Sequence, residues 1–137
     1  MTRQGKRGHD NSDFSDARIS RFIDDRRSLN EARRWRAFLP DSRDNETSVF
    51  DTQRLRESEI WEIADRYVAP ARKREVIARA DLTIGSATIS PLFLIRDDNP
   101  PRPPRHMAIR GWPPRDEKGR HKALAMQLSA ASVTVRR

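Results

Sequence analysis

The sequence contains no cysteine and only five glycines among its 137 residues. The absence of cysteine excludes disulfides, thiolate zinc sites and cysteine nucleophiles. The glycines are isolated from one another, so no glycine-rich phosphate-binding loop is present. No apolar run approaches the ~18 residues needed to cross a bilayer. The N-terminus also lacks the apolar segment of a secretory signal. We therefore expect a cytoplasmic protein that makes no contact with a membrane.

Large aliphatic and aromatic side chains are also scarce. Leu, Ile, Val and Phe together number 27 of 137 residues, while 35% of the residues are charged. A fraction just under ~20% is typical of chains that are partly disordered. The deficit is concentrated in residues 1–17, where Met1, Phe14 and Ala17 are the only apolar side chains. We predict a flexible tail over 1–17 and a single folded domain over 18–137.

Several short runs of apolar and β-branched residues predict strands. We expect the strands at 35–39 and 47–50 to pair as a hairpin, because a polar turn sequence joins them. We expect the strand at 92–96, the most apolar run, to lie at the centre of a sheet. The other predicted strands cover 19–23, 75–82, 106–109 and 132–135.

Two segments predict helices. Ile60, Ile63, Ala64 and Tyr67 follow the spacing of one helical face, and this helix should run from Glu57 to Val68 and end at Ala69-Pro70. A second helix should begin between Asp116 and Gly119 and continue to Ala131. Strands mixed with separate helices indicate an α+β fold. The expected architecture is a small, mostly antiparallel sheet with two packed helices and a flexible N-terminal tail.

Charge is distributed unevenly along the chain. Residues 35–69 carry a net charge of −3 and residues 70–137 a net charge of +8. A basic half of this kind favours an anionic partner, DNA or RNA first. Arginine can hold phosphates with two hydrogen bonds, and an exposed tryptophan can stack on a base. The predicted contact surface consists of Arg102, Arg105, His106, Arg110, Trp112, Arg115, Lys118, Arg120 and Lys122.

Patterns that suggest catalysis are weak. Glu57 and Glu59 are similar to the Glu-x-Glu pair of ADP-ribosylating enzymes, but they open a helix, where acids favour the helix dipole. His106 lies between two arginines without a partner acid or nucleophile fixed by spacing, and three scattered histidines give no metal signature. We therefore predict no catalytic residue, no metal and no cofactor.

The favoured function is a non-catalytic binding protein whose basic half contacts nucleic acid. One alternative is an interaction module in which the same arginines bind an acidic protein, with Trp112 as a buried anchor. A second alternative is a small toxin-like nuclease or ADP-ribosyltransferase that uses Glu59 or His106.

Several short sequence segments, taken in the order in which they occur, resemble a family of small uncharacterised bacterial proteins. They are Ala37-Phe38-Leu39-Pro40, Ser48-Val49-Phe50, Ile60-Trp61, Arg79-Ala80-Asp81, Arg105-His106 and Gly111-Trp112-Pro113. The resemblance covers about residues 19–132. It implies a bacterial origin and a compact domain, and it implies no activity, cofactor or catalytic residue.

Overall fold

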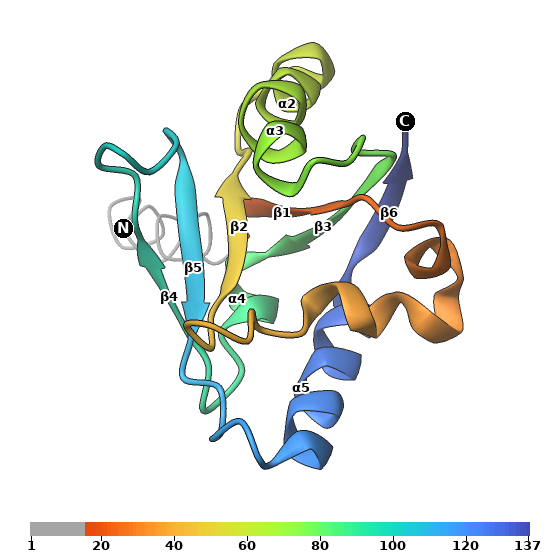
Figure 1. Ribbon diagram of the computed structural model, residues 1–137, viewed down its shortest axis with the longest axis vertical. Helices are drawn as coiled ribbons and strands as arrows, with labels where there is room; N and C mark the ends of the chain where they lie inside the picture. The colour runs from red at the N-terminus through yellow and green to blue at the C-terminus, as the bar shows by residue number, and fades with distance from the viewer. Residues whose placement is uncertain (1–15) are drawn as a thin grey trace, which may run out of the picture.

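The computed structural model describes residues 16–137, in which six strands form one antiparallel sheet in the order β4-β5-β2-β1-β3-β6 (Figure 1). The α+β class is confirmed. Residues 1–15 of the predicted tail lie outside the described residues. The strands are β1 (Arg18–Ile23), β2 (Thr47–Asp51), β3 (Ala78–Thr83), β4 (Phe93–Arg96), β5 (His106–Arg110) and β6 (Val133–Arg136).

Helices cover both faces of this sheet. The α-helices are α2 (Glu57–Ile63), α3 (Ala69–Arg72), α4 (Ile84–Ala87) and α5 (Lys118–Ala131), and a π-helical turn, η3 (Ala64–Val68), joins α2 to α3. Two 3₁₀ segments, η1 (Arg26–Leu29) and η2 (Glu31–Phe38), connect β1 to the loop before β2.

Strand β1 contributes side chains to a core on each face of the sheet, since successive side chains of a strand point to opposite sides. Ile19 and Ile23 belong to the core that contains Leu124 and Leu128 of α5. Phe22 belongs to a second core with Ile60 and Ile63 of α2, among others. The burial of β1 on both sides explains why its sequence, RISRFI, shows no clear alternation of apolar and polar residues.

The helix predicted over 57–68 is present but does not end at Ala69-Pro70. Pro70 lies at the start of α3, directly after the π-helical turn η3. The helical segment continues to Arg72 and stops at Lys73, which has a left-handed backbone with φ of 58°. The predicted end was therefore wrong by one turn.

One predicted strand is a helix instead, and another is a strand but not at the predicted place in the sheet. Residues 35–38 belong to the 3₁₀ helix η2, in which Trp35 and Phe38 share a face at the three-residue period of that helix, so no hairpin forms with β2. The run at 92–96 forms β4, which lies at the edge of the sheet, with the side chain of Phe93 49% exposed. Leu92, just before β4, is buried in the core.

The Gly-Trp-Pro-Pro corner joins β5 to α5 and is structural. Gly111 has φ of +89°, and a Cβ there would lie 2.3 Å from the carbonyl oxygen of Pro91, so only glycine fits. Trp112 is 6% exposed and its ring packs edge-on against His121 at 5.7 Å. The predicted stacking of Trp112 on a nucleic-acid base is therefore wrong, because the ring is buried.

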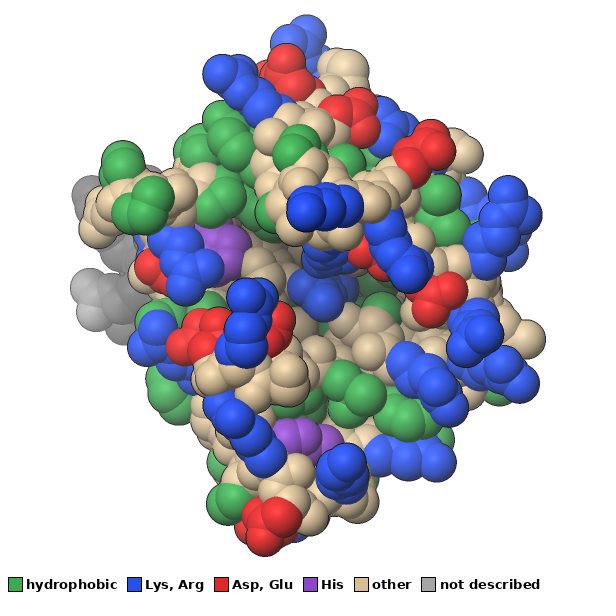
Figure 2. Space-filling model, in the orientation of Figure 1, with side chains coloured by type: hydrophobic (Ala, Val, Ile, Leu, Met, Phe, Trp, Pro, Cys, Tyr) green, Lys and Arg blue, Asp and Glu red, His purple; other side chains and the backbone are tan. Residues whose placement is uncertain are grey.

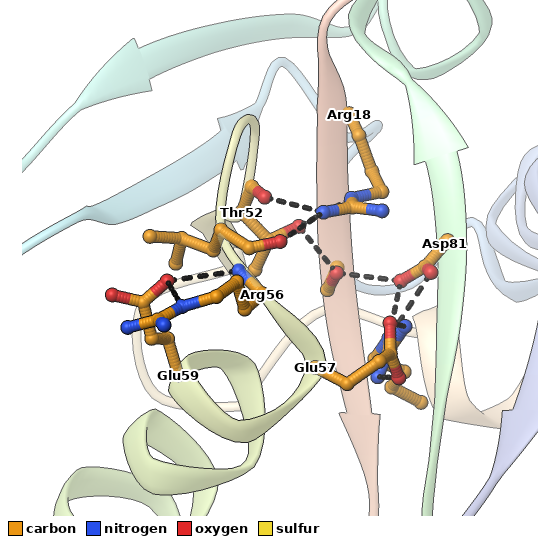
Figure 3. Close-up of polar contacts among 9 residues, drawn as sticks. Arg18, Thr52, Arg56, Glu57, Glu59 and Asp81 are labelled. Atoms are coloured by element: carbon orange, nitrogen blue, oxygen red, sulfur yellow. Dashed lines mark hydrogen bonds and ion pairs between the residues drawn. The ribbon is translucent and has the colours of Figure 1, made fainter.

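A buried arginine fastens α2 to the sheet. Arg79 of β3 is 1% exposed, and its guanidinium lies 3.0 Å from Asp81 and 2.8 Å from Glu57. Glu57 and Asp81 approach this point from α2 and from β3 (Figure 3). Trp61 lies with its ring 4.8 Å from the guanidinium carbon. These contacts fix the beginning of α2 over β3.

We predict that Arg79→Ala lowers the free energy of unfolding by about 3–5 kcal/mol, because it removes a buried charge and leaves the mostly buried Asp81 carboxylate without its charged partner. Arg120→Ala is the control. It breaks an exposed pair with Glu117 and should change stability by less than about 1 kcal/mol. Urea unfolding followed by circular dichroism measures both values, and equal losses would show that the Arg79 pairs do not anchor α2.

Candidate functional site

A cleft opens where β1 and β2 separate. The two strands pair only at Ile19 with Asp51 and at Ser20 with Phe50, and beyond this point β1 turns away from β2 (Figure 1). A cavity of about 340 Å³ lies at this place. We call it the arginine cleft; its lining includes Arg21, Ser48, Tyr67, Arg72, Arg102 and His106, together with the acidic side chains Asp41, Asp44 and Glu46 of the loop before β2.

Two arginines supply hydrogen bonds where the strands have separated. Arg21 of β1 donates through Nε to the carbonyl of Ala37 and through Nη1 to the carbonyl of Ser48, each at 2.7 Å. Arg72 of α3 donates through Nη1 to the carbonyl of Phe22 at 2.9 Å. Backbone carbonyls at the separated strands are thus satisfied by side chains instead of by the partner strand.

Arg21 forms no ion pair with a carboxylate among the described residues. Burial, together with the neighbouring positive charge of Arg72, lowers the pKa of Arg21 to about 9. Asp24 and Asp41 act on Arg21 only through space, and Asp24 forms its ion pair with Arg72, at 3.3 Å. At neutral pH the guanidinium remains charged, so an anion in the cleft would offset the cost of its burial.

A serine and a histidine form a direct hydrogen bond on the floor of the cleft. Ser48 Oγ of β2 lies 2.5 Å from His106 Nε2 of β5. The other ring nitrogen, Nδ1, lies 2.9 Å from the carbonyl oxygen of Asp97 and 3.7 Å from its carboxylate. The ring of Phe50 packs edge-on against His106 with centroids 5.5 Å apart. His106 is 4% exposed and is held on three sides.

A second hollow lies on the other side of the loop 39–46, between η2 and the first turns of α5. Its volume is about 480 Å³. Lys122 Nζ and the Arg36 guanidinium lie 5.0 Å and 5.3 Å from the Trp35 ring. We call this hollow the tryptophan groove; it is lined by Trp35, Leu39, Pro40, Asp41, Ser42, Asn45, Arg115, Lys118, His121 and Lys122.

The predicted contact residues divide between these two hollows and the surrounding surface. Arg102 and His106 line the arginine cleft, and Arg115, Lys118 and Lys122 line the tryptophan groove. Lys and Arg side chains gather around a central hollow on the face shown in Figure 2. The remaining basic residues are neutralised by ion pairs, Arg105 with Asp51, Arg110 with Glu46 and Arg120 with Glu117.

Sequence reasoning missed three side chains of these sites: Arg21, Trp35 and Ser48. A signal existed for Arg21, because it stands between Ile19 and Ile23 on the core side of a short apolar strand. No comparable signal existed for Ser48, which meets His106 across 58 positions of sequence. Trp35 was assigned to a strand, and its place beside Lys122 follows from the packing of η2 on α5.

The acidic patterns considered for catalysis have structural roles. Glu57 binds Arg79, whose hydrogen bond lowers the pKa of that carboxyl. Glu59 accepts a hydrogen bond from the backbone N–H of Arg56 at 2.9 Å and so caps α2. Neither carboxylate lines the arginine cleft. Within residues 16–137 there is no cluster of three metal-ligating side chains, and no helix in that part is long and apolar enough to span a membrane.

Comparisons with models of protein families, with curated proteins and with solved structures found no match to this chain. The resemblance to small bacterial proteins therefore stays a prediction.

We predict that inorganic phosphate stabilises the protein by binding between Arg21 and Arg72. At about ten times its Kd, phosphate adds ~1.4 kcal/mol to the free energy of unfolding, which raises Tm by about 4–6 °C in a domain of this size. Calorimetry in phosphate and in chloride of equal ionic strength measures the difference.

Arg72→Gln should abolish most of this phosphate effect. Arg74→Gln is the matched control, because Arg74 is exposed, lies two residues away and carries the same charge. An equal phosphate shift in all three proteins would indicate general salt stabilisation and would rule out a specific site.

Proposed function

We propose that this protein binds single-stranded nucleic acid across the loop 39–46, with bases on the tryptophan groove and a phosphate in the arginine cleft. One observation carries the proposal: Arg115, Lys118 and Lys122 converge on a groove beside Trp35. None of the three forms an ion pair with a carboxylate in the described part of the chain. Cations around an aromatic ring are the usual elements of a single-strand binding surface.

The groove favours single strands over duplexes. Trp35 is only partly buried, so part of its ring can meet an unstacked base, whereas the bases of a duplex are already stacked on one another. A base stacked on Trp35 would displace the Lys122 ammonium from the ring, and that ammonium could then bind a phosphate. The N-terminus of α5 begins at Lys118 and adds the favourable dipole of a 14-residue helix.

The two hollows are close enough in the fold to serve one strand. Leu39 and Asp41 line both of them, so the same loop forms a wall of each. Two of the three acidic side chains of this loop are held in ion pairs, and the third, Asp44, is exposed and accepts a hydrogen bond from the Glu46 N–H. Asp41 is paired with Arg43 and Glu46 with Arg110. The unpaired positive charge that remains belongs to Arg21 in the cleft and to the three cations of the groove.

We predict that Lys118→Ala combined with Lys122→Ala weakens binding of a fluorescent single-stranded oligonucleotide and flattens its salt dependence. Loss of two phosphate contacts should reduce the slope of log K against log salt by about 1.4. Trp35→Leu keeps an apolar side chain against the core and should cost about 1–3 kcal/mol of binding by removing the stacking surface. Fluorescence anisotropy at several salt concentrations measures both effects.

The control is Arg74→Ala combined with Arg136→Ala, which removes two exposed charges from the loop after α3 and from β6. This variant should retain the wild-type slope. Absence of binding to DNA and RNA at ~50 mM salt, where phosphate contacts are strongest, would overturn the proposal. Partners captured from a lysate that survive nuclease treatment would then favour the acidic-protein alternative.

A further inference from the structure

We propose that Ser48 is a nucleophile activated by His106, and that the arginine cleft accepts esters of phosphoric acid. The inference does not depend on binding of nucleic acid in the tryptophan groove. It rests on the direct Ser48–His106 hydrogen bond, on the partner of the second ring nitrogen, and on two guanidinium groups in the same cleft.

The hydrogen bonds determine which ring nitrogen of His106 carries the proton. The carbonyl oxygen of Asp97 can only accept, so His106 Nδ1 must donate to it at 2.9 Å. In the neutral ring Nε2 then has a free lone pair, and the Ser48 hydroxyl donates to that lone pair at 2.5 Å. This is the arrangement of a general base beside a hydroxyl nucleophile, with a third group that orients the base.

The backbone around His106 holds this geometry. Arg105, immediately before it, has a left-handed backbone with φ of 67°, and its carbonyl accepts a hydrogen bond from the Asp51 N–H at 2.9 Å. The N–H of Asp97 donates to the His106 carbonyl at 3.0 Å, so the two residues face each other across the β4–β5 connection. A left-handed non-glycine residue next to a buried histidine is a strained feature that the surrounding hydrogen bonds maintain.

The two guanidinium groups favour a phosphate ester as the electrophile. Arg21 binds the Ser48 carbonyl, which places its charge next to the serine. Neither Arg21 nor Arg72 donates a hydrogen bond through Nη2 among the described residues, so both Nη2 groups can bind non-bridging phosphate oxygens. Fixed cations at this position would stabilise the charge on the oxygens in the transition state.

The reaction needs no reagent other than the phosphate ester and water. Ser48 Oγ attacks phosphorus and its proton passes to His106 Nε2. The new O–P bond forms as the P–O bond to the leaving alcohol breaks, and His106 returns the proton to that alcohol. Water, deprotonated by His106, then attacks the phosphoserine, and Ser48 recovers its proton as the Oγ–P bond breaks.

The first test uses diisopropyl fluorophosphate, which reacts with activated serines with loss of fluoride. We expect one adduct, on Ser48 by peptide mass spectrometry, and no adduct in Ser48→Ala. His106→Gln, shown to be folded by circular dichroism, should react at least ~100-fold more slowly. Ser129→Ala, which removes a serine of α5 outside the cleft, should react like the wild type. Labelling that is absent, lies elsewhere or is unaffected by His106→Gln would overturn the assignment of the nucleophile.

The second test exploits the lack of cysteine in this chain. Ser48→Cys introduces a single thiol whose thiolate His106 should stabilise as an ion pair. Iodoacetamide should therefore alkylate Ser48→Cys at pH 6 at least about tenfold faster than it alkylates Ser129→Cys, and His106→Gln should remove the difference. Equal rates would show that His106 does not activate the group at position 48. This result would not depend on whether the larger diisopropyl fluorophosphate can enter the cleft.

The substrate class has its own measurement. We expect the wild type to release nitrophenol from bis(p-nitrophenyl) phosphate and the Ser48→Ala variant to release none. Hydrolysis of p-nitrophenyl acetate without hydrolysis of the phosphate diester would overturn the assignment to phosphate esters. Oligonucleotide binding by the wild type, measured separately, distinguishes failure of this inference from failure of the nucleic-acid proposal.

Discussion

The separation of β1 from β2 is the constraint on which the candidate site depends. Backbone carbonyls of a sheet must find donors when the neighbouring strand is absent. Here Arg21 and Arg72 provide those donors, one to the Ser48 carbonyl and one to the Phe22 carbonyl. The consequence is chemical as well as structural, because the same two hydrogen bonds place guanidinium groups at the cleft. A hydrophobic pair of side chains could fill the space, but it would leave these carbonyls without donors and the cleft without positive charge.

The walls of the cleft depend on a second buried charge. Tyr67 and Arg72 reach the cleft from η3 and α3, which continue from α2, and α2 is tied to β3 by Arg79. The π-helical turn shifts the register between α2 and α3, and such turns occur frequently at functional sites. Arg79 thus acts at a distance from the site, by fixing the start of the helical segment whose end carries Arg72.

The two hollows combine complementary chemistry on either side of one loop. The tryptophan groove offers an aromatic surface with unpaired cations, and the arginine cleft offers a hydroxyl beside an imidazole. The phosphate-containing ligand that we propose would contact both. Many other basic residues of the chain are ion-paired, so the high net charge by itself is a weaker argument for an anionic ligand than the few cations that remain unpaired.

The sequence by itself determined the elements whose signal is local. The period of Ile60, Ile63 and Ala64 predicted α2, and the run at 47–50 predicted β2. His106 was singled out, but its partner was not, because Ser48 reaches it only through the pairing of β2 with β5. Strand pairing, helix packing and the separation of β1 from β2 are long-range events that local periodicity does not encode. The tertiary structure therefore decided which tryptophans are partly exposed, which arginines are unpaired and which serine meets the histidine.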